Sequence, residues 1–291
     1  MSSNGPAKSD QHKQKIAGVF SRSAPTYDQV GPSFFTYFGR RLVELAQIPP
    51  GGRVLDVATG KGAVLFPAAE AAGAEGHAIG IDLAEGMVRE TDRQIHRLGL
   101  LNAEVHQMDA ENLQFPDDSF DCVLCGFAIF FFPNPDRILA EFRRILKPKG
   151  RLALTTWDNS GDNEQWKWLD ELVNKYLPPE EEKKEPAESS TAAKPDLFSQ
   201  AGIQELLNTK GFKVVHLSSE TRDVIYSSED EWWAAQWSHG GRAVLEEIEE
   251  KHGSDGLERY MAAVFEELKR IRQTDGIHDR SRTIYAVAVK P

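Results

Sequence analysis

Cysteine is scarce in this sequence, and long apolar runs are absent. The 291 residues include only Cys122 and Cys125, both inside one apolar, strand-like stretch. These two supply neither a disulfide framework nor a zinc cage, and their C-x-x-C spacing on a strand points the thiols to opposite faces. Nowhere do about 18 uncharged apolar residues follow one another, and residues 1–12 are polar. We therefore expect no membrane partner and a reduced, cytoplasmic setting.

Positive charge is also in short supply. The chain has 34 lysine and arginine residues against 45 aspartate and glutamate residues, a formal net charge of −11. Such a surface would repel a phosphate backbone unless a basic face were segregated from it, and the sequence shows no extended Lys/Arg cluster. We expect a small-molecule substrate rather than nucleic acid, and a monomer or a homodimer.

Short apolar runs alternate with helical patterns through the first half of the chain, which is typical of a parallel sheet covered by helices on both faces. Strands are expected at residues 53–58, 77–82, 103–107, 120–125 and 151–157, with helices at 63–73, 84–99 and 134–146. We predict a Rossmann-like α/β fold with a seven-stranded, mostly parallel sheet and a helical cap. Strands six and seven are expected from 212–219 and 282–290.

Composition divides the chain further. A second strand-like run at 222–227 precedes an aromatic helix at 229–238, and 178–195 is too polar and proline-rich to pack. The predicted parts are a disordered N-terminus (1–12), an N-terminal helical lid (13–48), a Rossmann-like core (49–160), a flexible acidic loop (178–196), and the rest of the core (197–291) with a helical cap inserted at 229–274.

The stretch VLDVATGKG, residues 54–62, joins a predicted strand to a predicted helix through closely spaced glycines. Such a turn lets a ligand approach backbone N–H groups and the helix N-terminus. A P-loop is excluded, because Gly60-Lys61 is followed by Gly62 and no matching upstream glycine exists. A dinucleotide turn is disfavoured by Leu65, which stands where a small residue is expected.

Acidic residues follow several of the predicted strands. Taken singly, Asp56 could cap a turn, Asp82 could cap a helix, and Asp109 could be a solvated turn residue. Together they fall at the carboxyl ends of successive parallel strands, where open α/β sheets bind ligands. Their joint placement favours a ligand site.

Four motifs in order resemble one family. VLDVATGKG is followed by GIDLAEGMV (80–88), HQMDAENLQFPDDSFDCV (106–123) and RILKPKGRLALTTW (144–157). This series is similar to that of the class I S-adenosylmethionine-dependent methyltransferases of the ubiquinone/menaquinone-biosynthesis type, also called methyltransferase type 11. The segment VFSRSAPTYD (19–28) resembles one that these enzymes fold over the cofactor.

The resemblance implies S-adenosylmethionine as the cofactor and suggests roles for individual residues. Asp82 would accept both ribose hydroxyls, Asp109 would face the adenine amino group, Ala110 would contribute its backbone amide, and Tyr27 would lie near the methionine end. Ala58 stands where the family usually has its first glycine. The implied cofactor-binding residues are Tyr27, Asp56, Ala58, Gly60, Gly62, Asp82, Leu83, Met87, Asp109, Ala110, Cys125 and Phe127.

Aromatic residues gather around the expected mouth of the site. SSEDEWWAAQWSHGG (227–241) carries three tryptophans outside the minimal fold, and we expect it to form, with the N-terminal helices, a lid over a flat or apolar acceptor. His239 either caps a helix or orients or deprotonates the acceptor as a catalytic residue. The candidate acceptor-binding residues are Phe34, Phe38, Phe130, Trp157, Trp232, Trp233 and Trp237.

Methyl transfer from a sulfonium needs no proton on the leaving group, so positioning and desolvation can supply much of the catalysis. Asp158-Asn159 matches only half of a known magnesium motif, and we expect no metal. The predicted function is methylation of an oxygen or nitrogen atom, with carbon less favoured, of a small aromatic or apolar molecule, as in secondary metabolism. The alternatives are carbon methylation of a quinone-like substrate, a non-catalytic S-adenosylmethionine-binding protein and a nicotinamide-dependent oxidoreductase.

Overall fold

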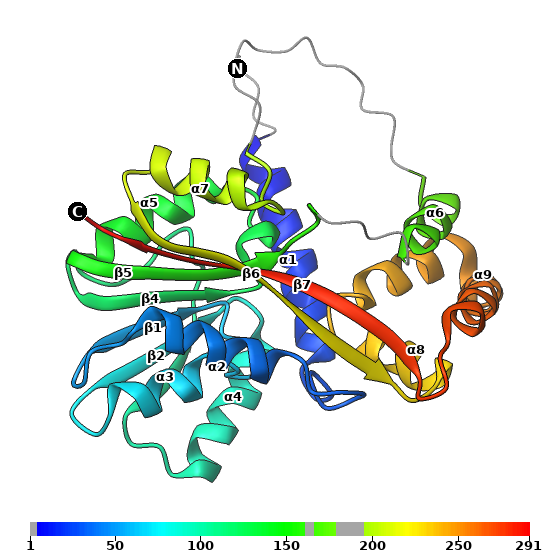
Figure 1. The fold of residues 1–291 in the computed structure, drawn as a ribbon, viewed down its shortest axis with the longest axis horizontal. Helices are drawn as coiled ribbons and strands as arrows, with labels where there is room; N and C mark the ends of the chain where they lie inside the picture. The colour runs from blue at the N-terminus through cyan, green and yellow to red at the C-terminus, as the bar shows by residue number, and fades with distance from the viewer. Residues whose placement is uncertain (1–4, 161–165, 179–194) are drawn as a thin grey trace, which may run out of the picture.

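The computed structural model describes residues 5–160, 166–178 and 195–291. Its centre is a seven-stranded sheet (Figure 1). The strands are β1 (Arg53–Val57), β2 (His77–Asp82), β3 (Ala103–Gln107), β4 (Phe120–Gly126), β5 (Leu146–Trp157), β6 (Lys213–Tyr226) and β7 (Ile277–Val289). Their order is β3-β2-β1-β4-β5-β7-β6; the first five run parallel and β7 is antiparallel to both neighbours. The Rossmann-like fold predicted from the alternation is confirmed.

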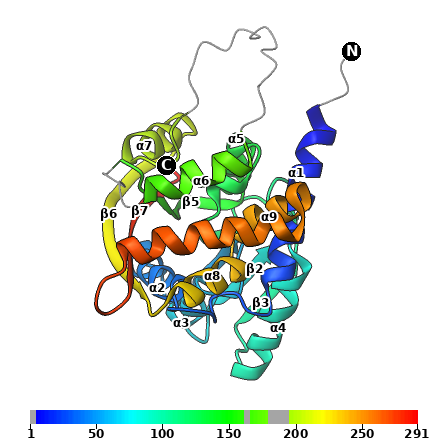
Figure 2. The ribbon, with the colours of Figure 1, turned by 90° about the vertical axis from the view of Figure 1, so that its right-hand side faces the viewer.

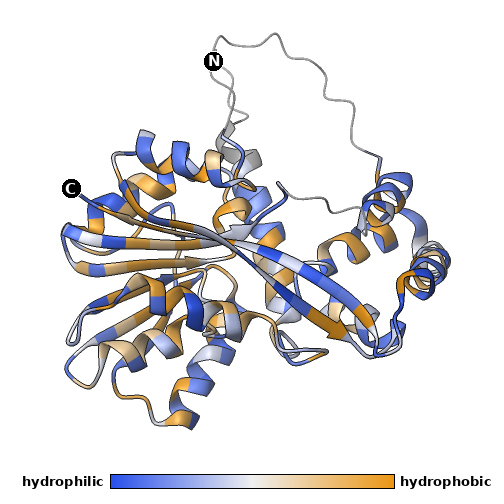
Figure 3. Ribbon diagram, viewed as in Figure 1, coloured by the Kyte–Doolittle hydropathy of each residue, from blue (hydrophilic) through white to orange (hydrophobic). Residues whose placement is uncertain are grey.

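Helices cover both faces of this sheet. They are α1 (Gly5–Ser23), α2 (Phe35–Ala46), α3 (Leu65–Ala72), α4 (Glu85–Leu98), α5 (Pro135–Ile145), α6 (Lys167–Tyr176), α7 (Gln200–Thr209), α8 (Glu229–Ser238) and α9 (Arg242–Ile271), with a short 3-10 helix at Ile129–Phe131. α5 and α7 pack on one face and α2 and α3 on the other. The central strands are correspondingly apolar (Figure 3).

The two cysteines of β4 lie on opposite faces of the sheet, as their spacing predicts. Cys122 joins the apolar cluster under α2 and α3, and Cys125 joins the one under α5 and α7. Both are free and buried, and burial raises the pKa of the Cys122 thiol to about 12. These thiols therefore contribute packing rather than redox chemistry.

β6 and β7 are longer than the sequence pattern indicates. The runs expected at 212–219 and 222–227 form one continuous strand, and β7 begins at Ile277 rather than at residue 282. Val224, Tyr226 and Ile277 on the added length are buried against the cap helices, which is why pairing continues there. The resulting two-stranded ribbon reaches out to α8 and α9 (Figures 1 and 2).

The N-terminus also differs from expectation. α1 begins at Gly5, so residues 5–12, expected to be disordered, are helical. α1 is anchored downstream by Ala17 and Phe20, which pack with residues of α4, and this contact gives the whole helix a surface to form on. Residues 1–4 and nearly all of the predicted loop at 178–196 lie outside the described residues. In the described part of the chain, none of the helices has the length and hydropathy needed to cross a bilayer.

The strand order reverses between β1 and β4, whose onward connections lead to opposite edges of the sheet. Open α/β sheets bind ligands outside the carboxyl ends of the strands at such a switch point. The turns that follow these strands therefore build the candidate site.

Candidate active site

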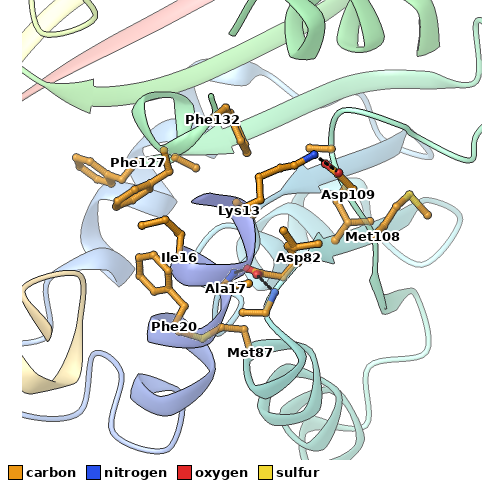
Figure 4. Close-up of a pocket in the computed structure, with 18 of the residues that line it drawn as sticks. Lys13, Ile16, Ala17, Phe20, Asp82, Met87, Met108, Asp109, Phe127 and Phe132 are labelled. Carbon is orange, nitrogen blue, oxygen red and sulfur yellow. Dashed lines mark hydrogen bonds and ion pairs between the residues drawn. The ribbon is translucent and has the colours of Figure 1, made fainter. Parts of the chain in front are cut away.

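A cavity of about 110 Å³, here called the strand-end cavity, lies at the carboxyl ends of β1, β2, β3 and β4 (Figure 4). α1 covers it with Lys13, Ile16, Ala17 and Phe20. The turns after the four strands contribute Ala58, Gly60, Asp82, Leu83, Ala84, Met108, Asp109, Ala110, Phe127 and Ala128. Segments far apart in the sequence thus converge under the N-terminal helix.

Asp82 is the central polar group of the strand-end cavity. Its Oδ2 accepts the Gly60 N–H at 2.9 Å and its Oδ1 accepts the Ala84 N–H at 2.9 Å. Desolvation raises the pKa of Asp82 to about 6, against the opposing effect of backbone hydrogen bonds, so the group is mostly ionised at neutral pH. A carboxylate has about four acceptor positions, which leaves capacity for hydroxyl groups of a ligand.

Two non-glycine residues of the site adopt left-handed backbone conformations. Ala58 after β1 has φ 55° and Phe127 after β4 has φ 50°. This region costs an L-residue roughly 1–2 kcal/mol, and such strain gathers at functional sites. Ala58 therefore keeps the backbone course that the family's glycine would take. Gly62 cannot be replaced in the same way, because a Cβ there would lie 2.6 Å from the Phe66 ring.

A second cavity of about 340 Å³, the glycine-turn cavity, adjoins the first and shares Tyr27, Ala58, Gly60 and Phe127 with it. Lys61 and Arg40 also line it, so cations are available for an anionic ligand group. Asp56 lies beneath the turn and accepts a hydrogen bond from Thr59 Oγ1 at 2.6 Å. Burial raises the pKa of Asp56 to about 7.

Asp109 is engaged by a cation from α1. Lys13 Nζ lies 2.7 Å from Asp109 Oδ2 and 3.3 Å from Glu111 Oε2 (Figure 4). Lys13 was not predicted as a site residue, although Lys13, Ile16, Ala17 and Phe20 follow the i, i+3, i+4, i+7 spacing of one helix face. That spacing was the available signal.

A third cavity of about 250 Å³, the aromatic cavity, lies between the core and the cap. Phe34, Phe35 and Trp157 line its core side, and Trp166, Tyr226 and Trp232 line its cap side. Rings that line this cavity contact rings that line the strand-end cavity: the ring centroids of Phe127 and Trp157 lie 4.4 Å apart, and Tyr27 stacks on Phe35 with the centroids 5.2 Å apart. The two cavities therefore share a boundary.

His239 and Asp279 line the aromatic cavity together with Asp28 and Tyr226. His239 is the C-cap residue of α8, and the Gly241 N–H donates to its Nδ1 at 3.4 Å. Desolvation lowers the pKa of His239 to about 4, so the ring is neutral at pH 7. Asp279 accepts hydrogen bonds from Ser281 Oγ at 3.1 Å and from Trp166. Desolvation raises the pKa of Asp279 to about 6.

The structure brings most of the predicted cofactor-binding residues together. Cys125 lines neither the strand-end nor the glycine-turn cavity, because its side chain points into the core, and the next residue, Gly126, lines both instead. The strand-end cavity is lined by Tyr27, Ala58, Gly60, Asp82, Leu83, Met87, Asp109, Ala110 and Phe127, and the glycine-turn cavity also by Asp56 and Gly62.

The predicted acceptor residues are divided. Phe34, Trp157, Trp232 and His239 line the aromatic cavity. Trp233 instead packs near Tyr260 and Phe265, and Trp237 lies under the Arg242 guanidinium, because positions 233 and 237 share a different helix face from 232, 235 and 239. Phe38 is buried in the core and Phe130 packs on Phe198.

Comparisons with known proteins identify the family. A family model described as a methyltransferase domain matches residues 54–150. The demethylmenaquinone methyltransferase of Listeria welshimeri is 33% identical over 172 residues, which cover 57% of this chain and 72% of that protein. The chain belongs to the class I S-adenosylmethionine-dependent methyltransferases of the ubiquinone/menaquinone-biosynthesis type.

Two further relatives are more similar over shorter spans. The aklanonic acid methyltransferase DauC of Streptomyces sp. (strain C5) is 42% identical over 50% of this chain and 66% of its own length. The nocamycin O-methyltransferase of Saccharothrix syringae is 43% identical over 47% of this chain and 49% of its own length. The chain thus matches less than two thirds of either relative.

Solved structures agree on the fold. A Bacillus halodurans protein assigned to the methyltransferases superposes with a TM-score of 0.57 and 21% identity, covering 87% of this chain and 98% of that one. At this identity the match concerns the fold alone.

The cavities fit the family's cofactor, S-adenosylmethionine. The Asp82 carboxylate suits a ribose diol, Asp109 suits a purine amino group, and Lys61 and Arg40 suit the methionine carboxylate. At Gly60 a Cβ would lie 3.9 Å from Tyr27 Cε1, its nearest neighbour, so the bare backbone leaves room there for a ligand. The two cavities thus offer a carboxylate for the ribose, a carboxylate for the purine amino group and two cations for the methionine carboxylate.

Proposed function

We propose that this protein transfers the methyl group of S-adenosylmethionine to an oxygen or nitrogen atom of a small, flat molecule held in the aromatic cavity. The observation that carries the proposal is the shared wall of Phe127 and Trp157, one lining the strand-end cavity and the other the aromatic cavity, 4.4 Å apart. Oxygen is favoured because one relative is named an O-methyltransferase.

When bound, S-adenosylmethionine supplies an electrophilic methyl group whose sulfur leaves as a neutral thioether. The residues of this chain would bind, orient and exclude water. Tyr27 and Phe35 stack between the cavities, and α1 closes the strand-end cavity over Asp82 and Asp109. Positioning of this kind can supply a large part of a displacement reaction.

His239 would orient the acceptor rather than deprotonate it. Its Nδ1 accepts the Gly241 N–H, which favours the tautomer with the proton on Nε2. A neutral ring with a pKa of about 4 is a weak base but a competent hydrogen-bond donor. We also propose a cytoplasmic location and a monomeric or homodimeric state.

Calorimetry with S-adenosylhomocysteine tests the proposal first. We expect binding in the wild type, a loss of roughly 30-fold or more in Asp82→Ala because hydrogen bonds to a charged group contribute about 1.5–3 kcal/mol each, and no change in Asp92→Ala. Asp92 is an exposed aspartate on α4 and serves as the matched control. Preference for NAD, or no binding in the wild type, would sink the proposal.

Turnover is measured next. Radiolabelled S-adenosylmethionine and a panel of dihydroxynaphthalenes, aminonaphthols and hydroquinones should yield methylated product at oxygen or nitrogen. Exclusive methylation at carbon would favour the quinone alternative. Tight cofactor binding without transfer to any acceptor would favour a non-catalytic binding protein.

A further inference from the structure

The aromatic cavity has an unusual polar lining for a site beside a cationic cofactor. Its lining residues, all in the described part of the chain, include no lysine or arginine. The titratable side chains there are Asp28, Asp279, His239 and Tyr226. Any charged group of a ligand would meet carboxylates and aromatic rings.

Asp28 is already committed to the N-terminus of α2. Its Oδ1 accepts the Phe34 N–H at 2.7 Å and the Phe35 N–H at 3.2 Å, and its Oδ2 accepts the hydroxyls of Ser33 and Thr36. The carboxylate thus acts as the cap of that helix. Its acceptor capacity is used within the protein.

Asp279 retains acceptor capacity. Two donors are recorded for it, Ser281 Oγ and Trp166, and a carboxylate has about four acceptor positions. Trp166 and Trp232 stack beside it with ring planes 16° apart and so form an apolar surface on the cap side of the same cavity. A flat ligand against these rings would present its edge to the carboxylate.

The strand register places Asp279 away from the cofactor side. Trp157 of β5, whose ring lies beside Phe127, pairs with Thr283 of β7. Asp279 lies four residues before Thr283 on β7 and pairs with Val224 of β6. Four residues of strand correspond to about 13 Å at about 3.4 Å per residue. Asp279 therefore meets the end of a ligand remote from the reacting atom.

We propose that the aromatic cavity selects a flat aromatic molecule without a negative charge that carries a hydroxyl group at the end remote from the methylated atom, and that Asp279 binds this hydroxyl. The inference rests on the proposed function, since it assigns the substrate class of the proposed acceptor cavity. Asp279 acts as a specificity residue and takes no part in bond making.

Charge excludes an anionic ligand. A carboxylate on the ligand would lie beside Asp279 with no lysine or arginine in the cavity lining to compensate it. A hydroxyl has one donor, which Asp279 satisfies alone.

Isothermal titration of the 291-residue chain with three naphthalenes of one shape tests the inference. The probes are 2-naphthol, 2-methoxynaphthalene and 2-naphthoate, each measured with and without S-adenosylhomocysteine. We expect 2-naphthol to bind about tenfold more tightly than 2-methoxynaphthalene, and 2-naphthoate to bind more weakly than 2-naphthol. Equal binding of the first two, or tighter binding of 2-naphthoate, would overturn the inference.

Variants assign the effect to Asp279. In Asp279→Ala the preference for 2-naphthol over 2-methoxynaphthalene should disappear, and in Asp279→Asn, which keeps an acceptor oxygen, part of it should remain. Asp230→Ala, an exposed aspartate in the first turn of α8, is the matched control and should behave as wild type. A preference retained in both Asp279 variants would contradict the assignment.

The two proposals fail in different ways. Normal S-adenosylhomocysteine binding without any binding of 2-naphthol overturns the substrate class and leaves cofactor binding intact. Absent S-adenosylhomocysteine binding, with the 2-naphthol preference retained, overturns the proposed function while the ligand preference of the cavity stands.

Discussion

The strand-end cavity and the aromatic cavity are built in different ways. The first takes its acidic groups from the carboxyl ends of β2 and β3, where a short motif fixes both the strand and the turn, and receives Lys13 from α1. The second takes Phe34, Trp157, Trp166, Trp232 and Asp279 from five separate segments, held together by the extended β6–β7 ribbon and the cap helices. In a site built from strand ends, substitutions are tolerated only in the turns. In a site built from side chains of distant segments, each lining side chain can be substituted separately.

The sharpest way to separate the cavities is to compare neighbouring tryptophans of α8. Trp232→Leu should weaken 2-naphthol binding about tenfold through lost ring contact and leave S-adenosylhomocysteine affinity unchanged. Trp233→Leu should lower the unfolding temperature without altering the affinity for either ligand, because Trp233 packs on Tyr260 and Phe265. Calorimetry and thermal denaturation check both variants; equal losses of naphthol affinity would contradict the separation.

The buried His239 of the aromatic cavity should make the free energy of unfolding depend on pH. Its pKa of about 4 in the folded protein lies below the usual value of 6.5, so the unfolded chain binds the proton first. The contribution to stability is complete above pH 6.5 and declines as the pH falls toward 4, by up to about 1.4 kcal/mol per pH unit. His239→Gln should therefore show a shallower loss of unfolding free energy over this window.

Urea unfolding of both proteins between pH 7 and pH 4.5 measures this difference. Burial also raises the pKa of three aspartates, Asp56, Asp82 and Asp279, which therefore change the free energy of unfolding with pH in the opposite direction. These three residues are present in both proteins, so their effect cancels in the comparison. Parallel stability curves for wild type and variant would show that His239 is not desolvated.

α1 lines one side of the strand-end cavity, and substitution of its Lys13 should change the affinity for the cofactor product. Lys13→Gln should raise S-adenosylhomocysteine affinity about two- to fivefold. In the wild type the purine amino group competes with the Lys13 ammonium for the Asp109 carboxylate, and loss of that ion pair costs about 0.5–1 kcal/mol. The control is Lys15→Gln. Lys15 lies on α1, as Lys13 does, and its substitution removes an exposed ion pair with Glu247 of α9. Weaker binding in Lys13→Gln would mean that the lysine assists the cofactor instead.

The smallest expected effect concerns backbone strain. Ala58→Gly should raise the unfolding free energy by about 0.5 kcal/mol, since relief of the left-handed alanine exceeds the added chain entropy of glycine. Ala68→Gly inside α3 should lower it by about 1 kcal/mol. Chemical denaturation measures both, and a destabilised Ala58→Gly protein would show that the strain is absent.

The sequence predicts the residues of the strand-end cavity better than those of the aromatic cavity. The acidic residues after β1, β2 and β3 were predictable, because a strand end and its turn are set by a few neighbouring residues. Lys13, Trp166 and Asp279 were missed, because nothing local marks a helix face that will cover a cavity or a strand that continues beyond its sheet. Trp233 and Trp237 were predicted for the acceptor site, yet the rotation of α8 points them elsewhere.

The sequence by itself determined the alternation of strands and helices, the glycine turn, the order of the motifs and hence the family and the cofactor. These depend on interactions within a few residues, for which apolar periodicity and turn chemistry are sufficient. Only the tertiary structure decided that α1 places Lys13 on Asp109 and that β6 and β7 continue into the cap to set Asp279 opposite Trp166 and Trp232. Those contacts join residues separated by up to about half the chain, so they depend on how the packed elements meet rather than on any local pattern.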